Sequence, residues 1–205
     1  MTTTIEQRRY TLEEYLEMEY NSRRRHYFYR GIVAPMTYTS DNHGLIVANL
    51  IGELHRAFKG SDYRVYPSDR MLFVPDCQLN YYPDVMIVKG QPEFHQHSPK
   101  MQATLNPYAI IEVASDSTEH YDKVDKWLCY RQIPSLQQYF IVSQKQFYID
   151  IYHRIDQSDR WENSYVVKEE DLVEIAGFPI PLADIYHLVK FAADSEDSES
   201  TIEPS

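Results

Sequence analysis

The sequence is poor in the residues that mark disulfide frameworks, nucleotide-binding loops and membrane anchors. Its two cysteines, Cys77 and Cys129, are too few for a disulfide framework or a cysteine-rich zinc site. We predict two reduced thiols, with Cys129 buried on a helix. Six glycines, without a GxGxxG or GxxxxGK(S/T) motif, argue against a glycine-cradled nucleotide. No apolar run approaches the roughly 20 residues that cross a bilayer, and the N-terminal segment lacks the apolar stretch of a signal peptide. We therefore expect a cytoplasmic protein without a membrane partner.

Basic residues are also scarce. The chain carries 20 lysines and arginines against 31 aspartates and glutamates, a formal net charge of −11, which argues against a large nucleic-acid-binding face. Residues 193–205 are rich in serine and acids and contain no base, so we interpret them as a disordered tail. The remaining residues, 1–192, fit a single domain. Two basic runs, at 8–9 and 23–25, could contact phosphates or pair with neighbouring glutamates.

Local patterns predict a mixed sheet with helices packed on it. A capping box from Thr11 to Glu14 predicts a helix to about Tyr20, and Asp41 or Asn42 can cap an amphipathic helix that reaches residue 58. Strands are expected at 26–33, 63–67, 71–74, 84–88, 108–114, 138–142, 147–154 and 165–167, a further helix from 117 or 118 to about 131, a polar loop at 91–106 and an apolar segment at 182–191. We assign the fold class α/β (α+β), with a mixed central sheet flanked by helices.

Two carboxylates stand where apolar strands are expected. Asp84 follows Pro83 and opens one strand, and Glu112 lies inside the near-continuous apolar run YAIIEVA, which is typical of a strand buried on both faces. A buried carboxylate without a partner costs several kcal/mol or becomes neutral. Glu112 therefore requires compensation by a metal ion, a cation or a hydrogen-bond network.

The helix after this strand supplies a candidate cation. Asp122, Lys126 and Tyr130 are spaced by four residues and share one helix face, which can fold back over the carboxyl end of the strand. Two carboxylates and a lysine suit phosphodiester hydrolysis, because hard oxygen ligands hold Mg²⁺ and a lysine can stabilise developing charge. The alternative is a structural ion pair between Glu112 and Lys126, with Asp84 as a turn residue; Pro75-Asp76 shows that the dipeptide also occurs elsewhere in the chain.

Other candidate groups indicate less about the function of the protein. His95 and His97 lack the further ligands of a zinc site, and we assign them to the polar loop. His43 can approach the metal site or form a hydrogen bond within the fold. The 18 tyrosines suit semi-buried sheet positions, base stacking or a dimer interface. We expect nucleic acid and a second copy of the chain as partners.

The ordered series of these motifs resembles the Uma2, or DUF820, family. The resemblance lies in YYPDVMIV (81–88), AIIEVASDST (109–118), the spaced Asp122, Lys126 and Tyr130, and PSLQQYFIV (134–142), and it covers roughly residues 10–190. It implies a restriction-endonuclease-like fold of the PD-(D/E)xK superfamily and hydrolysis of phosphodiester bonds, in DNA. By this resemblance Asp84 and Glu112 hold Mg²⁺ (or Mn²⁺). Lys126 is the catalytic cation, and the groups that support the site are Asp122, Tyr130 and His43.

The sequence departs from the family pattern at two positions. The superfamily lysine belongs two residues after the glutamate, where this chain has Ala114, so Lys126 is the natural substitute. Family members also carry a glutamate about four residues before a glycine in an early strand. Here Tyr27 takes that position before Gly31, with Arg30 beside the glycine. The alternative function is therefore a catalytically degenerate nuclease-fold protein that acts as a binding or regulatory homodimer.

Overall fold

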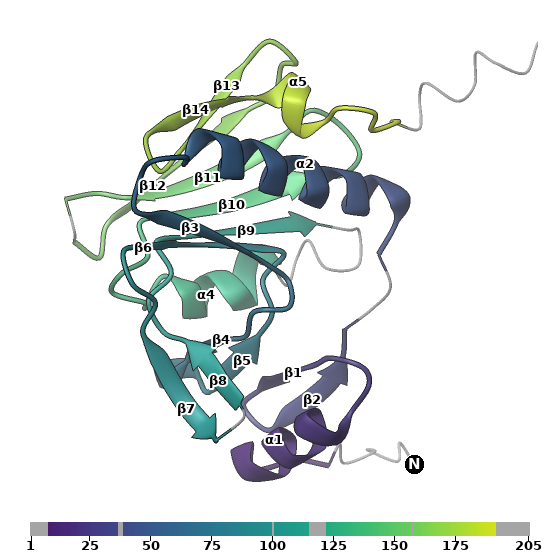
Figure 1. Ribbon diagram of the computed structural model, residues 1–205, viewed down its shortest axis with the longest axis vertical. Helices are drawn as coiled ribbons and strands as arrows, with labels where there is room; N and C mark the ends of the chain where they lie inside the picture. The colour runs from purple at the N-terminus through teal and green to yellow at the C-terminus, as the bar shows by residue number, and fades with distance from the viewer. Residues whose placement is uncertain (1–7, 37–38, 100, 115–121, 157, 192–205) are drawn as a thin grey trace, which may run out of the picture.

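The computed structural model describes residues 8–36, 39–99, 101–114, 122–156 and 158–191. These residues form two six-stranded sheets, a separate hairpin and several helices (Figure 1). Both sheets are mixed, because each contains one parallel pair of strands among antiparallel ones. The assigned α+β class with a mixed sheet flanked by helices is confirmed, although the sequence did not indicate the second sheet.

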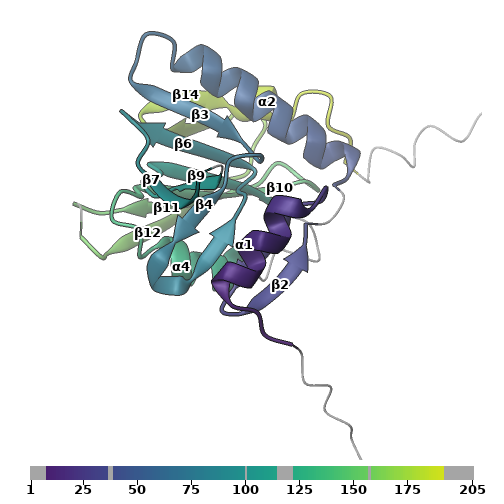
Figure 2. The ribbon, with the colours of Figure 1, turned by 60° about the horizontal axis from the view of Figure 1, so that its bottom comes forward.

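The first sheet has the order β2-β1-β5-β4-β8-β7. Its strands are β1 (His26–Tyr29), β2 (Ile32–Pro35), β4 (Leu72–Val74), β5 (Leu79–Tyr81), β7 (Phe94–Ser98) and β8 (Met101–Thr104). The short 3-10 helix η1 (Pro75–Cys77) connects β4 to β5. The helix α1 (Leu12–Asn21) begins at the predicted capping box, in which Glu14 N–H donates to the Thr11 hydroxyl and Thr11 N–H donates to the Glu14 carboxylate. Figure 2 shows α1 beside β2 at one end of the molecule.

The second sheet has the order β12-β11-β10-β9-β6-β3. Its strands are β3 (Tyr63–Pro67), β6 (Val85–Lys89), β9 (Ala109–Ala114), β10 (Gln138–Ser143), β11 (Ile149–Arg154) and β12 (Trp161–Val166). All six residues of β9 are buried, as the apolar run YAIIEVA predicted. Strand β9 is parallel to β10 and antiparallel to β6, which places it in the interior of the sheet.

Each face of β9 packs against a different helix. Ile111 and Val113 belong to the core cluster that includes Ile46 and Leu50 of the long helix α2 (Asp41–Ala57). Ile110 and Ala114 belong to a second cluster, which contains residues from both sheets and from α4 (Trp127–Tyr130). Helix α4 follows directly on the π-helical turn η2 (Asp122–Lys126). Because side chains alternate along a strand, that of Glu112 lies on the same face as those of Ile110 and Ala114 and therefore faces α4.

The remaining elements close the core on the α2 side. The hairpin of β13 (Leu172–Ile175) and β14 (Phe178–Pro181) leads into α5 (Leu182–Ile185). Val173, Ile180 and Leu182 are buried in the cluster that contains α2, and Figure 1 shows this hairpin and α5 above α2. Within the described ranges, no helix is both long and apolar enough to span a membrane.

Several boundaries predicted from the sequence were wrong. Residues 26–33 form a hairpin rather than one strand, because Arg30 and Gly31 both adopt positive φ values, 47° and 86°, and allow a two-residue turn. Residues 91–106, predicted as a loop, contain β7 and β8, whose polar side chains suit an exposed strand pair. The N-cap of α2 is Ser40 rather than Asp41 or Asn42. The sequence did not indicate β5, β13 or β14, and the expected tail at 193–205 lies outside the described residues.

Candidate active site

The two predicted carboxylates lie at the same end of one antiparallel ladder. Val85, the first residue of β6, pairs with Ile111 of β9. Asp84 precedes Val85 and Glu112 follows Ile111, so the register places the two acids opposite one another at this end of the sheet. The spacing between the motifs, 28 residues in sequence, gave no information about this register, which the strand pairing supplies.

Glu112 is buried, and Lys126 and Tyr130 both contact its carboxylate. Its side chain is 3% exposed, and Lys126 Nζ lies 3.1 Å from Glu112 Oε2. The Tyr130 hydroxyl donates to Glu112 Oε1 at 2.9 Å. The compensation that the apolar strand required is thus supplied, among the described residues, by a cation together with a hydrogen-bond donor.

The helical spacing of Lys126 and Tyr130 explains how both reach one carboxylate. Lys126 ends the π turn, and Tyr130 ends α4 one turn later, so the two side chains project from the same face. Asp122 begins η2, and its side chain lies outside the part of the chain that can be described. Of the three residues predicted to share this helix face, Lys126 and Tyr130 contact Glu112 in the structure.

Tyr130 acts as a donor to Glu112 under all ordinary conditions. Burial, and then the charge of Glu112, raise the pKa of Tyr130 well above its usual value. The phenol therefore keeps its proton and fixes one oxygen of Glu112, while Lys126 fixes the other.

Lys126 is covered by an aromatic ring that the sequence analysis did not identify. The Lys126 ammonium lies 3.8 Å from the centre of the Tyr81 ring, a distance at which the cation is attracted to the ring face. The ring of Tyr27 lies 5.8 Å from that of Tyr81. Tyr27 therefore packs against the same aromatic ring that covers Lys126.

Asp84 is held by the backbone of β9 and by a histidine from α2. Its Oδ2 accepts the Val113 backbone N–H at 2.8 Å and lies 3.2 Å from His43 Nε2. His43 sits in the first turn of α2, where its own N–H donates to the N-cap Ser40. Both donors reach the same oxygen, and the Asp84 side chain stays 16% exposed. His43, which we predicted to support the site, is thus in contact with Asp84.

The pair His95 and His97 lies on β7 and not in a loop. Its rings, 4.6 Å apart, both pack on Phe73, and His97 Nε2 lies 3.0 Å from Asn80 Oδ1. Burial, and then the neighbouring His95, lower the pKa of His97 to about 4.

Within the ranges that the structure covers, no group of three or more His, Cys, Asp or Glu side chains is arranged to hold a metal ion.

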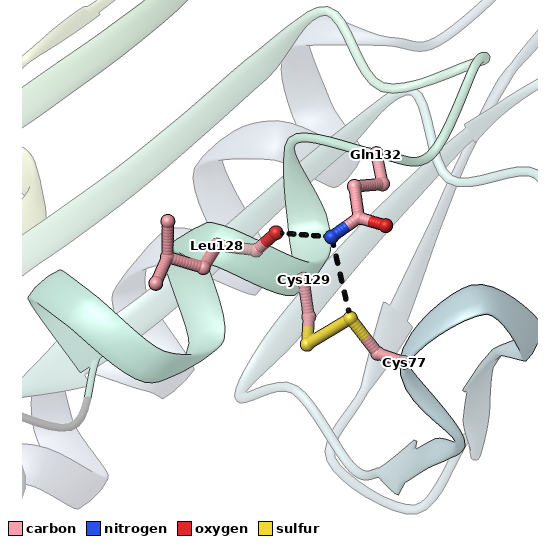
Figure 3. Close-up of a disulfide and its surroundings, with 4 residues drawn as sticks. All are labelled: Cys77, Leu128, Cys129 and Gln132. Carbon is pink, nitrogen blue, oxygen red and sulfur yellow. Dashed lines mark hydrogen bonds between the residues drawn. A yellow bond between two sulfur atoms is a disulfide. The ribbon is translucent and has the colours of Figure 1, made fainter.

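The two cysteines form a disulfide, so the prediction of two reduced thiols was wrong. Cys77 ends η1 and Cys129 lies in α4, with their Cα atoms 5.7 Å apart. The prediction that Cys129 is buried on a helix is confirmed, since it is 1% exposed. Figure 3 shows the disulfide with Gln132 beside it. A sequence separation of 52 residues carries no local pattern that could have indicated this pairing.

A surface cavity lies away from these residues. It encloses about 820 Å³ between α2 and β3 and is lined by residues such as His55, Lys59 and Arg64. None of the predicted site residues lines it. The candidate site is therefore defined by the end of the β6–β9 ladder.

The two carboxylates suit Mg²⁺ chemically. Mg²⁺ prefers hard oxygen ligands, keeps several waters and is commonly held by one or two carboxylates. Asp84 offers such a group at the rim of the sheet, with its described protein donors on one oxygen only. Glu112 lies beside it in the register. Mg²⁺ sites of this kind commonly use one or two carboxylates together with water and substrate phosphates.

Comparison with solved structures shows that this fold occurs in another protein. A solved structure from Anabaena variabilis ATCC 29413, described as "a putative nuclease belonging to DUF820", matches with a TM-score of 0.70. The match covers 86% of this chain and 97% of that chain at 12% sequence identity, so it shows the fold alone. This chain therefore has the fold of that DUF820 protein.

The sequence comparisons show the family. The model of the Uma2 family, described as "Putative restriction endonuclease", matches residues 12–183, and the chain belongs to this family. Two uncharacterized proteins of Synechocystis sp. (strain ATCC 27184 / PCC 6803 / Kazusa) are similar. One is 32% identical over 145 residues, covering 71% of this chain and 81% of that protein. The other is 28% identical over 179 residues, covering 87% and 92%.

Proposed function

We propose that this protein is a Mg²⁺-dependent endonuclease that hydrolyses phosphodiester bonds in DNA. In this proposal Asp84 and Glu112 hold the ion, which Mn²⁺ can replace, and Lys126 is the cation of the site. The observation that carries the proposal is the position of Glu112, a nearly inaccessible carboxylate beside Lys126 and opposite Asp84 at the end of one ladder. Membership of the Uma2 family supports the choice of reaction.

The residues of the chain would prepare the site before any substrate arrives. Lys126 and Tyr130 each bind one oxygen of Glu112, so the direction of this carboxylate is fixed in advance. Val113 and His43 do the same for Asp84 Oδ2. A bound Mg²⁺ would act as a Lewis acid toward the phosphate and make a bound water more acidic. Fixed groups around charge that develops in a transition state contribute because they need no reorganisation.

Lys126 would act mainly through Glu112. Its side chain is 2% exposed and lies between Glu112 and the Tyr81 ring. A cation so close to a metal-binding carboxylate keeps that carboxylate oriented and adds positive potential where negative charge develops on a phosphate. His43 would support Asp84 in the same way, through its contact with Oδ2.

A second candidate function rests on Tyr27. The ring of Tyr27 packs against Tyr81, in the position where the family pattern has a glutamate, and Arg30 forms the adjacent turn. Loss of that acid favours a nuclease-fold protein that binds nucleic acid or a second copy of the chain without cleaving DNA.

Metal titration separates the two candidates. We expect Mg²⁺ and Mn²⁺ to bind the wild type in isothermal titration calorimetry, and Asp84→Asn to weaken binding at least tenfold while the fold is retained. Asp76→Asn is the matched control, because Asp76 also follows a proline, in η1, and should bind as the wild type does. Equal binding by the wild type and Asp84→Asn would remove Asp84 from the metal site.

Plasmid nicking tests the chemistry. The wild type should convert supercoiled to open-circular DNA with Mg²⁺ and not with EDTA. Asp84→Asn should lose this activity by a hundredfold or more, and Asp76→Asn should keep it. Residual nicking that is equal in the wild type and Asp84→Asn would come from a contaminant, and metal binding without nicking would support the non-catalytic candidate.

A further inference from the structure

The disulfide joins the first sheet to the helix that carries the site. Cys77 lies in η1, between β4 and β5, and Cys129 lies in α4. The chain between them contains Asp84, Glu112 and Lys126. Cys129 stands three residues after Lys126 and directly before Tyr130, so the covalent link is attached to the same helical turn whose side chains bind Glu112.

Helix α4 needs tertiary contacts to keep its position. It has four residues and follows a five-residue π turn, whereas isolated helices shorter than about 12 residues are marginal in water. Leu128 on its outer side is 51% exposed and adds little packing. Cys129 and Tyr130 are the residues of α4 that are fully buried, and one of them is covalently tied to η1.

We propose that the Cys77–Cys129 disulfide is a redox-controlled tether that positions Lys126 and Tyr130 against Glu112, and that a dithiol reductant releases it. The part of this proposal that concerns catalysis rests on the proposed nuclease function. The part that concerns the position of α4 rests only on the geometry of the disulfide and the helix. The oxidised protein is the ordered state of the site and the reduced protein the loosened one.

The disulfide is buried, and an exposed glutamine side chain contacts it. Gln132 is exposed, and its Nε2 lies 3.5 Å from Cys77 Sγ while it donates to the Leu128 carbonyl at 2.7 Å. Figure 3 shows this amide placed between the helix and the Cys77 sulfur. Pro75, Asp76 and Gln78 around Cys77 are exposed as well. We therefore expect rotation of the Gln132 side chain to increase the access of a reductant to Cys77 Sγ.

The dithiol reductant supplies the electrons and protons that the thiol–disulfide exchange requires. A thiolate of the dithiol attacks Cys77 Sγ, and the S–S electron pair leaves with Cys129, which takes up a proton. In the resulting mixed disulfide, the second thiolate of the reductant attacks the sulfur atom that belongs to the reductant. This closes the disulfide of the reductant and releases Cys77 as a thiolate, which is protonated in turn. The protein gains two electrons and two protons overall, and the dithiol becomes a disulfide.

Hydrogen exchange tests the tether without any assumption about catalysis. In the wild-type protein treated with dithiothreitol, with two free thiols confirmed by alkylation and mass spectrometry, we expect amide exchange in 122–132 to accelerate at least tenfold. Exchange in β11 should change by less than twofold, and reoxidation should restore the original rates. Equal exchange in both states, or two free thiols in the air-oxidised protein, would overturn the proposal.

Gln132 provides a test of access. Gln132→Ala removes the amide beside Cys77 and should increase the rate of reduction by dithiothreitol about fivefold or more. Gln102→Ala, which shortens an exposed glutamine on β8, is the matched control and should be reduced at the wild-type rate. If both variants are reduced at the wild-type rate, Gln132 does not guard the bond and the assigned path of attack is wrong.

The effect on catalysis needs a separate measurement. Reduced wild type should nick plasmid about tenfold more slowly at saturating DNA, with an unchanged KM, and reoxidation should restore the rate. Unchanged kcat despite accelerated exchange in α4 would overturn the catalytic part of the proposal. If the oxidised protein itself shows no nicking, the proposed nuclease function fails, while the exchange and reduction-rate experiments still decide whether the tether exists.

Discussion

Lys126 and Glu112 form an ion pair 3.1 Å long in which both side chains are almost completely removed from solvent. Taking two charges out of water costs several kcal/mol per ion in real proteins, and their attraction offsets this only when other hydrogen bonds are also made. Tyr130 and the Tyr81 ring provide such contacts. The pair therefore adds little net stability, but removal of either partner alone should be costly. These energetics suit a pair whose role is to hold Glu112 in position.

Removal of one charge tests this dependence. Lys126→Met keeps the length of the side chain but leaves Glu112 charged and without its cation. The free energy of unfolding should fall by about 3 to 5 kcal/mol, measured by urea denaturation at pH 7. Lys168→Met, at an exposed position, is the control and should stay within about 0.5 kcal/mol of the wild type.

The double variant Glu112→Gln/Lys126→Met removes both charges. Because the uncompensated charge is then gone, it should recover at least half of the stability that Lys126→Met loses. Additive losses in the double variant would show that the two side chains are not energetically coupled.

Much of this site could be predicted from local patterns, because its key features are periodic or compositional. The spacing of Lys126 and Tyr130 placed them on one helix face, and a single acid in an apolar strand marked Glu112 as a residue that needs a partner. The structure places Lys126 and Tyr130 at Glu112. Their roles in metal binding and catalysis stay predictions that the titration and nicking experiments test.

The features that the sequence did not reveal depend on contacts between distant segments. Tyr81 ends a three-residue strand, too short to show an alternating pattern, so its ring against Lys126 could not be anticipated. The link between Cys77 and Cys129 closes across 52 residues, and two cysteines alone give no geometry. The β1–β2 turn uses Arg30 and Gly31, which differ from the Asn-Gly and Asp-Gly pairs that usually mark a two-residue hairpin.

The Tyr130 hydroxyl contributes a hydrogen bond to a charged, buried acceptor. Tyr130→Phe deletes the donor to Glu112 Oε1 and changes little else in volume. Because hydrogen bonds to charged groups contribute about 1.5 to 3 kcal/mol, we expect a loss in this range by urea denaturation. Tyr165→Phe, at an exposed position on β12, should be neutral, and an equal loss in both variants would contradict the assigned role of the Tyr130 hydroxyl.

His97 should make the protein less stable in weak acid. Its folded pKa is about 4, lowered from 6.5 by burial and then by His95. Between these values the unfolded chain takes up a proton that the folded protein does not, so the stability present above pH 6.5 is lost as the pH falls toward 4. Because the ring is partly exposed, we expect a loss on the order of 1 kcal/mol.

Urea denaturation of variants at pH 7.0 and pH 4.5 measures this contribution. His97→Gln removes the titrating ring and keeps a donor for Asn80, so the difference in stability between the two pH values should shrink relative to the wild type. His187→Gln, which changes an exposed histidine after α5, should leave the difference unchanged. An identical acid response in the wild type and His97→Gln would assign the loss to other groups.

The β1–β2 turn should tolerate no side chain at Gly31, for two separable reasons. Gly31 has a φ of 86°, and a Cβ there would lie 3.3 Å from both Arg9 Cβ and the Tyr10 carbonyl oxygen. The Tyr10 N–H also donates to the Gly31 carbonyl at 2.9 Å, so the segment before α1 is fixed against this turn. Gly60 has a similar φ of 88°, but a Cβ at that position would meet no described atom within 4 Å.

Comparison of the two alanine variants separates backbone strain from crowding. Gly60→Ala should lose about 1 to 2 kcal/mol, the cost of a left-handed conformation for an L-residue. Gly31→Ala should lose more than Gly60→Ala, because the chain before α1 must also move, and it should accelerate amide exchange at Tyr10. If both variants lose the same free energy and Tyr10 exchange is unchanged, the contact between the turn and residues 9–10 contributes nothing to the docking of α1 on β1. The N-terminal helix would then be held by its other contacts, among them those of Tyr15 and Glu19, whose side chains reach the His26 backbone.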